Sequence, residues 1–260
     1  MKNIKVLTNF YYKPTQGFEN WVKENSDWAV PFNGGGSQKG YFKNQIEDRK
    51  PELNWMLNEN SALMNVSEFQ EIMREIQDAE AVGLQNYRRV FKKEDLECLD
   101  GYDGLVARSI RLGFYGQPVQ VKTQYGLMHV PEDFTVFDRA VEDISSVSYS
   151  SFLEWTMLYD LAAPCDTFVF KKDVFMKYLA DWRKFIDTVM NRLPAEELEK
   201  RDEYQRRALA FLSERFLSLW VFSQYVQGRM KFKSVDLEEH LDWKPVENRQ
   251  YDADGTLRSF

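Results

Sequence analysis

The sequence predicts an α/β fold in which strands and helices alternate through the first two-thirds of the chain and helices dominate the last third. Short apolar runs bounded by polar loops predict buried strands, and long apolar or amphipathic stretches near the end predict helices. The 260 residues fit one large domain with a helical portion. We expect the folded domain to span residues 1–235 and a polar tail to span residues 236–260.

The expected strands are short apolar runs, and the first ends in a polar loop that contains Lys13 and Pro14. They are Ile4–Thr8, Trp28–Phe32, Ala81–Gln85, Gly104–Ala107, Thr167–Phe170 and Met230–Val235. We interpret Thr167–Phe170 as an edge or late strand. Gly34–Gly36 predicts a flexible loop, which is either a plain linker or a place where the backbone approaches a ligand.

The expected helices follow from helical periodicity and from start signals. They are Leu53–Leu63, Ser67–Ile76, Lys92–Leu99, a helix from Pro131 to about Ile144, Ser151–Leu161, Asp173–Arg192 and Asp202–Gln227. Ser67 with Gln70 three residues later has the pattern of a capping box. Residues 108–130 are rich in glycine and aromatic residues, and we expect them to be irregular.

Composition excludes several classes of protein. The net charge of −7 argues against broad nucleic-acid binding, which needs a surplus of cations. The two cysteines, Cys98 and Cys165, make a poor disulfide framework and indicate reduced thiols in a cytoplasmic protein. No apolar run approaches the roughly 18 residues of a membrane span, and the N-terminus lacks the apolar core of a signal peptide. We therefore expect a soluble cytoplasmic protein, with peripheral contact at the inner membrane face as an option.

Motifs of several common enzyme classes are missing from the sequence. The only two histidines, His129 and His240, do not suffice for a multi-histidine metal site, and no Cys/His spacing resembles zinc ligation. There is no Gly-x-Ser-x-Gly elbow and no plausible Gly-x-Gly-x-x-Gly fingerprint. A hydrolase of the first kind and a dinucleotide-dependent oxidoreductase are therefore not expected.

The segment Asn86-Tyr87-Arg88-Arg89 follows an expected strand directly. Ligands in α/β sheets lie beyond the carboxyl ends of strands, and guanidinium groups pair bidentately with phosphate oxygens. The two arginines, together with Lys13 at another strand exit, therefore suggest a site for a diphosphate. The alternative is a surface charge pair.

Glu214 and Arg215 lie inside an expected helix that is apolar on nearly every side. Such a helix is buried, and buried charges are costly unless they are paired. The two residues are either a structural ion pair or part of the floor of a site. Asp166, at the entry to the strand Thr167–Phe170, is a further candidate carboxylate.

Several blocks of residues together resemble bacterial capsular and exopolysaccharide-biosynthesis glycosyltransferases, a family long known only as a domain of unknown function. The blocks are Lys13-Pro14, Gly83-Leu84-Gln85-Asn86-Tyr87-Arg88-Arg89, Gln124-Tyr125 through His129 to Asp133, Asp166–Lys172, Tyr204–Arg207 and Phe211–Arg215. The resemblance covers roughly residues 4–235. It departs from the family pattern at Asn86, where the family has histidine, and over residues 33–66.

The resemblance implies a GT-A-like fold, with a nucleotide-sugar-binding sheet flanked by helices. It also implies a hexosyltransferase that moves a sugar from a nucleotide diphosphate, with UDP-galactofuranose as the first donor to test, to a hydroxyl of a surface polysaccharide or lipid-linked glycan. On this interpretation Glu214 and Asp166 are the catalytic carboxylates. The donor-binding residues are Lys13, Tyr87, Arg88, Arg89 and Arg215, and the sugar- or acceptor-binding residues are Gln124, Tyr125, His129 and Arg206.

Typical GT-A enzymes hold a divalent metal with an Asp-x-Asp motif, and here the corresponding strand exit has Asn86-Tyr87-Arg88. Arginine charge can neutralise a diphosphate leaving group in place of a metal. We therefore expect no cofactor, with Asp100 and Asp103 as the alternative pair of carboxylates for Mn²⁺ or Mg²⁺. Two other functions stay open, a nucleotidyltransferase on a similar scaffold and a non-catalytic glycan-binding protein.

Overall fold

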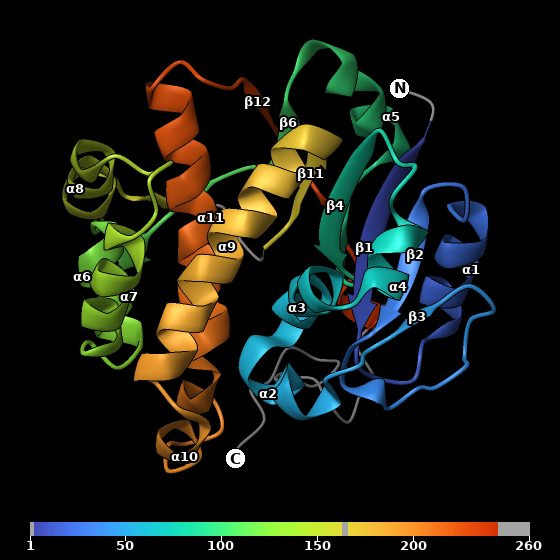
Figure 1. Ribbon diagram of the computed structural model, residues 1–260, viewed down its shortest axis with the longest axis horizontal. Coiled ribbons are helices and arrows are strands. Elements are labelled where there is room, and N and C mark those ends of the chain that lie inside the picture. Colours follow the sequence, from blue (N-terminus) through green and yellow to red (C-terminus); the bar gives the residue numbers. More distant parts are fainter. Residues whose placement is uncertain (1–2, 163–165, 244–260) are drawn as a thin grey trace.

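The computed structural model describes residues 3–162 and 166–243 and shows a mixed α/β fold around one mostly parallel sheet (Figure 1). The strand order along the sheet is β12-β6-β11-β4-β1-β2-β3. Only β11 runs antiparallel to its neighbours on this path. The strand bounds are β1 Ile4–Phe10, β2 Ala29–Asn33, β3 Ile46–Glu47, β4 Ala81–Asn86, β6 Gly104–Ala107, β11 Phe168–Lys171 and β12 Phe232–Val235.

The six predicted strands are confirmed to within two residues at each end. Thr167–Phe170 differs in its position, because β11 lies inside the sheet between β4 and β6 and is not an edge strand. Its three apolar residues Phe168, Val169 and Phe170 are fully buried on both faces, as an inner strand requires. Because β11 is antiparallel to β4, the beginning of β11 lies at the edge where β4 ends.

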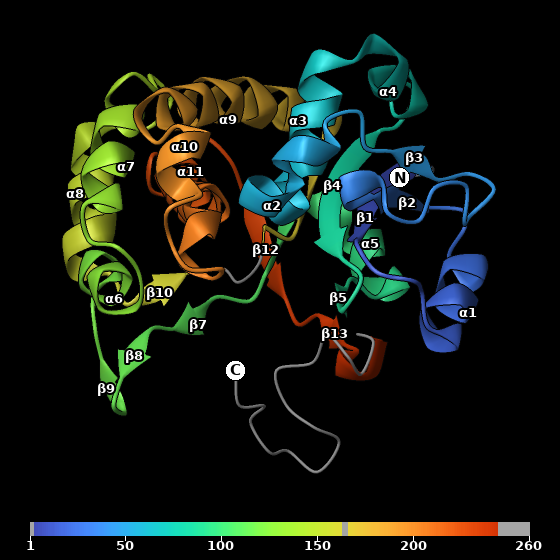
Figure 2. The same cartoon turned by 90° about the horizontal axis from the view of Figure 1, so that it is seen from below.

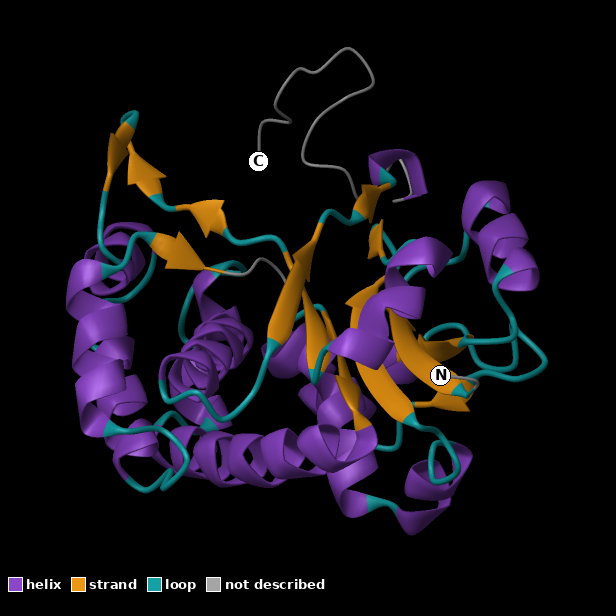
Figure 3. Ribbon diagram, turned by 90° about the horizontal axis from the view of Figure 1, so that it is seen from above, coloured by secondary structure: helices purple, strands orange, loops and turns teal. Residues whose placement is uncertain are grey.

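Two hydrophobic cores lie on the two faces of the sheet. Side chains alternate between faces along each strand, so neighbouring residues enter different cores. Leu7 of β1 and Phe168 of β11 belong to the larger core, whereas Val6 and Val169 belong to the smaller one. Figures 2 and 3 show the helices that flank the sheet. Both faces are covered, which explains why these strands are apolar throughout.

The described helices vary from single turns to more than five turns. They are α1 Gln16–Glu24, α2 Asn54–Leu57, α3 Ser61–Glu68, α4 Gln70–Glu75, α5 Lys93–Leu96, α6 Val121–Met128, α7 Asp133–Glu142, α8 Tyr149–Leu158, α9 Lys172–Arg192, α10 Ala195–Leu198 and α11 Ala208–Val226. The long helices α9 and α11 pack on each other and on α7 and α8. This is the predicted helical C-terminal portion, and Figure 1 shows it beside the sheet.

The predicted helix Leu53–Leu63 is wrong as a single element. Helix α2 ends at Leu57, a 3-10 turn spans Asn58–Asn60, and α3 then begins at Ser61. The predicted capping box is also wrong, because Ser67 lies inside α3 and its hydroxyl donates to the Met64 carbonyl at 2.8 Å. A serine within a helix can bond back to the preceding turn, so the local pattern does not fix the helix start.

Two further expectations about helices need correction. Helix α11 begins at Ala208 rather than Asp202, because the Asp202 carboxylate accepts the Tyr204 and Gln205 N–H groups and closes a separate turn. A 3-10 turn, Gln205–Arg207, precedes the helix. Residues 108–130 are only partly irregular. They contain α6 and the short strands β7 Ile110–Arg111, β8 Gly113–Phe114 and β9 Gln117–Pro118, and β7 pairs with β10 Leu161–Ala162.

The first residues of the predicted polar tail are part of the packed structure. Strand β13 Glu238–Glu239 pairs with β5 Arg89–Val90. The Trp243 indole lies over α1, where a Cβ added to Gly17 would be 2.4 Å from Trp243 Nε1. The rest of the tail, 244–260, lies outside the described residues, as does Cys165.

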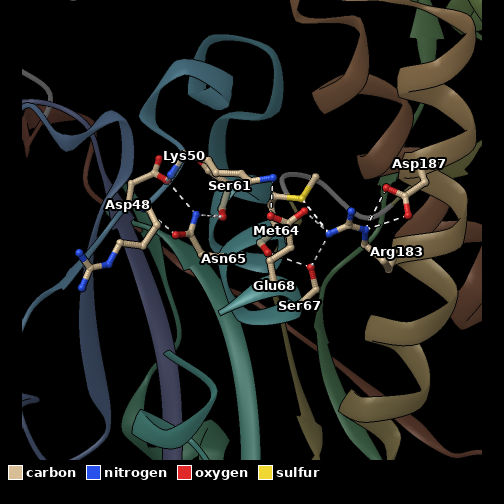
Figure 4. Close-up of polar contacts among 10 residues, drawn as sticks. Asp48, Lys50, Ser61, Met64, Asn65, Ser67, Glu68, Arg183 and Asp187 are labelled. Atoms are coloured by element: carbon tan, nitrogen blue, oxygen red, sulfur yellow. Dashed lines mark hydrogen bonds and ion pairs between the residues drawn. The ribbon is translucent and has the colours of Figure 1, made fainter. Parts of the chain in front are cut away.

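A polar network fixes α3 against α9 and against the loop that follows β3 (Figure 4). The Glu68 carboxylate forms ion pairs with Lys50 and Arg183. The Arg183 Nε also contacts Asp187 at 2.9 Å on the next turn of α9. Three residues before Glu68 on the same helix, the Asn65 amide donates to Asp48 Oδ1 and to the carbonyl of Ser61, the first residue of α3, both at 2.8 Å. The beginning of α3, and with it the turn Asn58–Asn60, is therefore held in place.

Candidate functional site

Polar side chains converge where β1 and β4 end. Asn9 of β1 and Asn86 of β4 are register partners on adjacent parallel strands, and both side chains are buried. Tyr11 and Tyr87 follow them, with ring centroids 6.3 Å apart. The carboxyl edge of a parallel sheet is where α/β proteins bind ligands. Buried amides need partners, and both asparagines find them in one segment.

That segment is the turn Asn58–Asn60 between α2 and α3. The Asn9 side-chain amide donates to the Glu59 carbonyl at 3.2 Å, and the Asn86 amide donates to the Glu59 carboxylate. Burial first, and then the negative charge of Glu59, raise the pKa of the Tyr11 hydroxyl. Glu59, which the sequence analysis did not select, therefore lies at the centre of the strand exits.

Arg88 and Arg207 lie beside this centre, and Arg206 lies next to Arg207 and over α2. Within residues 3–162 and 166–243, Arg88, Arg206 and Arg207 form no ion pair, whereas Arg89 and Arg215 do. The Nε atoms of Arg88 and Arg206 are buried and have no hydrogen-bond partner in the same part of the chain. Buried donors are nearly always satisfied in native proteins, so such groups indicate a ligand position.

Aromatic rings support these guanidinium groups. Arg88 lies over the Tyr87 ring at 5.6 Å, Arg206 over Trp55 of α2 at 5.7 Å, and Arg207 over Phe211 of α11 at 5.5 Å. Arg207 also donates to the Asn58 side-chain oxygen from Nε at 2.7 Å when that amide is oriented to face it. The arginines are therefore oriented by packing and by an amide rather than by acids.

The other predicted cations have different surroundings. The Arg89 Nε contacts Glu239 Oε1 of β13 at 2.8 Å, in the short pairing of β5 with β13. Lys13 is exposed beyond the end of β1. Of the two arginines beside the end of β4, Arg88 is thus the one that forms no ion pair with a described residue. Burial is the largest effect on the Tyr87 hydroxyl, and it raises the pKa.

Asp166 lies at the same edge, because β11 begins where β4 ends. A chain of hydrogen bonds leads to it from the helices. The Trp182 indole donates to Ser213 Oγ at 2.6 Å, the Ser213 hydroxyl donates to Asn60 Oδ1 at 2.8 Å, and the Asn60 amide donates to Asp166 Oδ2 at 2.6 Å. The other oxygen, Oδ1, is buried and has no hydrogen-bond partner in the described part of the chain.

Asp166 is the most buried of the candidate carboxylates. Burial is the main cause that raises the pKa of Asp166 well above its ordinary value, and the nearby Glu214 carboxylate adds to it. Glu214 itself is one-quarter exposed and pairs with Arg215, at 2.8 Å between Oε2 and Nη1. The ion pair that was one of the two alternatives for these helix charges is therefore present. Asp166 is thus suited to hold a proton.

Three of the residues predicted at the sugar or acceptor site, Gln124, Tyr125 and His129, lie near Arg215, whereas the fourth, Arg206, lies over Trp55 of α2. Gln124 accepts from Arg215 Nη2 at 3.1 Å, and the Tyr125 ring lies 5.4 Å below the guanidinium. His129 is buried and stacks on Phe211, with ring centroids 4.1 Å apart. Burial first, and then the charge of Arg215, lower the pKa of His129 to about 3, so its imidazole is neutral near pH 7.

Tyr125 is fully buried, and its hydroxyl approaches Asp133 Oδ2 at 3.5 Å. Arg201 binds both oxygens of that carboxylate, at 2.6 and 2.8 Å. Held in this way, the Tyr125 ring packs against the Arg215 guanidinium and against the His129 ring, whose centroid is 4.7 Å away. The predicted roles of Gln124, Tyr125 and His129 stay predictions.

The alternative metal carboxylates lie elsewhere. Asp100 and Asp103 precede β6, which is parallel to β4, so they are at the opposite edge of the sheet. The Asp103 carboxylate accepts the Lys231 N–H there at 2.7 Å. In residues 3–162 and 166–243 no three His, Cys, Asp or Glu side chains are grouped to hold a metal ion. Metal independence stays a prediction.

Comparison with known proteins identifies the family. A family model described as a domain of unknown function (DUF4422) matches residues 59–225, and the chain belongs to that family. The fold is similar to that of the apo structure of the bifunctional glycosyltransferase WbbM, with a TM-score of 0.68, 14% sequence identity, and coverage of 91% of this chain and 45% of that one. The chain thus spans less than half of that protein. A comparison with curated proteins finds no match.

The predicted fold class is confirmed by this likeness, since the mostly parallel sheet flanked by helices matches a glycosyltransferase fold. At 14% identity the likeness concerns the fold alone. In the described part of the chain, every helix is too short or too polar to cross a membrane.

Proposed function

We propose that the chain is a glycosyltransferase that moves a sugar from a nucleotide diphosphate to a hydroxyl group of a glycan acceptor. The observation that carries the proposal is the set of half-buried arginines, Arg88, Arg206 and Arg207, around the ends of β1 and β4. Each lacks an ion pair within the described residues, and two of them have a buried Nε without a partner. A diphosphate supplies the acceptor oxygens and negative charge that these groups lack.

Transfer leaves a nucleoside diphosphate, whose charge grows as the bond to the sugar breaks. Guanidinium groups that are oriented before the reaction stabilise that charge without reorganising. We propose that Arg88 binds the diphosphate from the strand exit and that Arg206 and Arg207 bind it from the turn before α11. Lys13 is the exposed cation at the same edge, and Arg89 contributes less because Glu239 already pairs with it.

The acceptor hydroxyl must lose a proton during transfer. Glu214 is our candidate for the base, because its carboxylate is partly exposed and is oriented by Arg215 Nη1 at 2.8 Å. Asp166, buried behind it, is the second candidate. Galactofuranose as the sugar, a UDP donor, a polysaccharide or lipid-linked acceptor and independence from metal all remain proposals supported by the sequence resemblance.

Thermal-shift and calorimetric titration with UDP, GDP, ADP and UDP-sugars, each in EDTA and in Mn²⁺, tests the proposal. A ligand at 100 times its dissociation constant stabilises the folded state by about 2.7 kcal/mol. We expect Arg88→Ala to weaken binding of the preferred diphosphate by roughly 10- to 100-fold, because charged hydrogen bonds are worth about 1.5–3 kcal/mol. Arg89→Ala, its matched control, stays within about threefold of the parent.

Turnover with a UDP-sugar then separates the three functions. A glycosyltransferase releases the nucleoside diphosphate, a nucleotidyltransferase releases pyrophosphate, and a glycan-binding protein shows no nucleotide-dependent stabilisation. Equal binding by the parent and by Arg88→Ala would contradict the phosphate site. Loss of turnover in EDTA with recovery in Mn²⁺ would contradict metal independence.

A further inference from the structure

The turn Asn58–Asn60 has an unusual backbone. Asn58 has φ +46° and ψ −121°, a conformation that residues other than glycine rarely adopt. Such a residue is strained and persists only when its surroundings hold it. Here the surroundings are polar contacts: the Ser61 hydroxyl and the Asn9 amide both donate to the Asn58 carbonyl, and Arg207 donates to its side chain.

The strained turn presents the Glu59 side chain at the exits of β1 and β4. One carboxylate oxygen, Oε1, accepts from the Asn86 amide, and the Tyr11 hydroxyl lies close by. In the described ranges no Lys or Arg comes within ion-pair distance of Glu59. The Glu59 side chain is half-buried, and the neutral amide of Asn86 holds it in position. Its carboxylate therefore has no cation partner among the described residues.

An ionised carboxylate only accepts hydrogen bonds. It repels phosphate oxygens, so in a site for a nucleotide diphosphate it must face the part of the ligand that donates. The donors of such a ligand are the N–H groups of its base and the hydroxyl groups of its sugar rings, and the sugar rings are the parts bonded directly to the phosphates. The arginines at the same edge, Arg88 and Arg207, are the complementary groups for the phosphates.

We propose that Glu59 accepts a hydrogen bond from a ring hydroxyl of the bound nucleotide sugar and thereby selects ligands that carry that hydroxyl. The inference rests on the proposed function and adds a specificity-determining residue to it. The hydroxyl belongs either to the ribose or to the transferred sugar, and both present the same chemistry to Glu59. Asn86 and Asn58 act as positioning residues, one for the carboxylate and one for the turn.

The test compares ligands that differ by one hydroxyl on the parent and on Glu59→Gln. Calorimetry would use UDP, 2′-deoxy-UDP, 3′-deoxy-UDP and a UDP-hexose, or the same set of whichever nucleotide the parent prefers. If the ribose is the partner, we expect the parent to bind UDP roughly 10- to 100-fold more tightly than one deoxy analogue, and Glu59→Gln to lose most of that preference. If the transferred sugar is the partner, the lost preference is that for UDP-hexose over UDP.

Glu52→Gln, a change of an exposed glutamate in the turn before α2, is the matched control and should keep every preference of the parent. A melting curve of each variant confirms folding, because Glu59→Gln can still accept the Asn86 amide through its side-chain oxygen. The inference is overturned if Glu59→Gln keeps all of the preferences, or if it weakens every ligand by the same factor. A parent that binds no nucleotide overturns the proposed function as well, so the two failures are distinguishable.

Discussion

Asp166 should make the stability of the protein depend on pH in a way that one substitution removes. The carboxyl is buried and forms no ion pair with a described residue, and the Glu214 and Glu59 carboxylates add to the effect of burial. The Asn60 amide and the Arg215 charge act in the opposite direction but do not outweigh it. The native state therefore holds the Asp166 proton at pH values where the unfolded chain has released it.

The sign follows from proton linkage. A raised pKa in the folded state means that folding takes up a proton, so stability is full below the unfolded pKa of about 3.9 and falls as the pH rises towards the folded pKa. In that window the free energy of unfolding falls by about 1.4 kcal/mol per pH unit. For a chain of this size, 1 kcal/mol corresponds to about 2–4 °C in Tm, so the slope is roughly 3–6 °C per pH unit.

Asp166→Asn keeps the shape and removes the titration. Its side-chain oxygen can still accept the Asn60 amide, which now donates to Asp166 Oδ2 at 2.6 Å. We expect the variant to resemble the parent near the unfolded pKa of about 3.9 and to become progressively more stable than it as the pH rises towards the folded pKa, because the variant has no carboxyl at this position to take up a proton. Denaturant unfolding at each pH measures the difference directly.

The exposed Asp173 supplies the control, because Asp173→Asn should shift the parent curve without changing its slope. A constant difference between Asp166→Asn and the parent would show that Asp166 does not bind the extra proton. A difference that grows towards low pH would show the reverse arrangement, an ionised Asp166 stabilised by Arg215. Either result would refute the argument from burial.

Two further predictions concern the sheet and the candidate base. Gly83→Ala in β4 should lower the free energy of unfolding by about 2–3 kcal/mol or more, because the new Cβ would be 2.3 Å from the Phe168 carbonyl oxygen. Gly101→Ala is the control and should be neutral in the same denaturant titration, because its new Cβ would have nothing within 4 Å. Glu214→Gln should lower turnover about 10²-fold or more with donor affinity nearly unchanged; normal turnover per folded molecule, with early melting, would make Glu214 a structural partner of Arg215.

The strands of the sheet could be predicted from the sequence because each is a recognisable apolar run. Buried on both faces, runs such as Ile4–Thr8 and Ala81–Gln85 are continuously apolar, and turn residues bound them. Strand order is a different matter. Nothing within Thr167–Phe170 indicates that it inserts between β4 and β6 in the antiparallel direction, since this depends on how long connections return to the sheet.

The site was predicted in part for the same reason. Some candidate residues lie at the end of a strand or on an apolar helix, where a charged side chain stands out in the sequence. These are Asp166 before β11, Arg88 after β4, and Glu214 and Arg215 in α11. Glu59 escaped notice because helical periodicity on either side suggested one continuous helix. The run Asn58-Glu59-Asn60, three polar residues between two apolar stretches, was the available signal for a break.

The local sequence pattern also does not predict that Arg88 and Arg89 differ in their ion pairing. Adjacent in sequence and identical in chemistry, they differ because β13, about 150 residues later, places Glu239 against Arg89 and leaves Arg88 without an ion pair in the described chain. A sequence motif therefore identifies the pair, and only the tertiary structure separates a cation that is already neutralised from one that is available to a ligand.

A carboxylate and a guanidinium group that both contact one turn would ordinarily form an ion pair with each other. Glu59 and Arg207 both contact the turn Asn58–Asn60 but form no ion pair. Each is held by a neutral amide instead, Glu59 by Asn86 and Arg207 by Asn58, whose backbone is strained in the process. Direct pairing would satisfy both charges within the protein, so stability alone does not account for the separation. A nucleotide sugar does account for it, because its diphosphate requires a cation without an ion pair and the hydroxyl groups of its adjoining sugar rings require an acceptor. Asn86 at the end of β4 and Asn58 in the turn are thus best explained as the residues that keep the two charges available to a ligand.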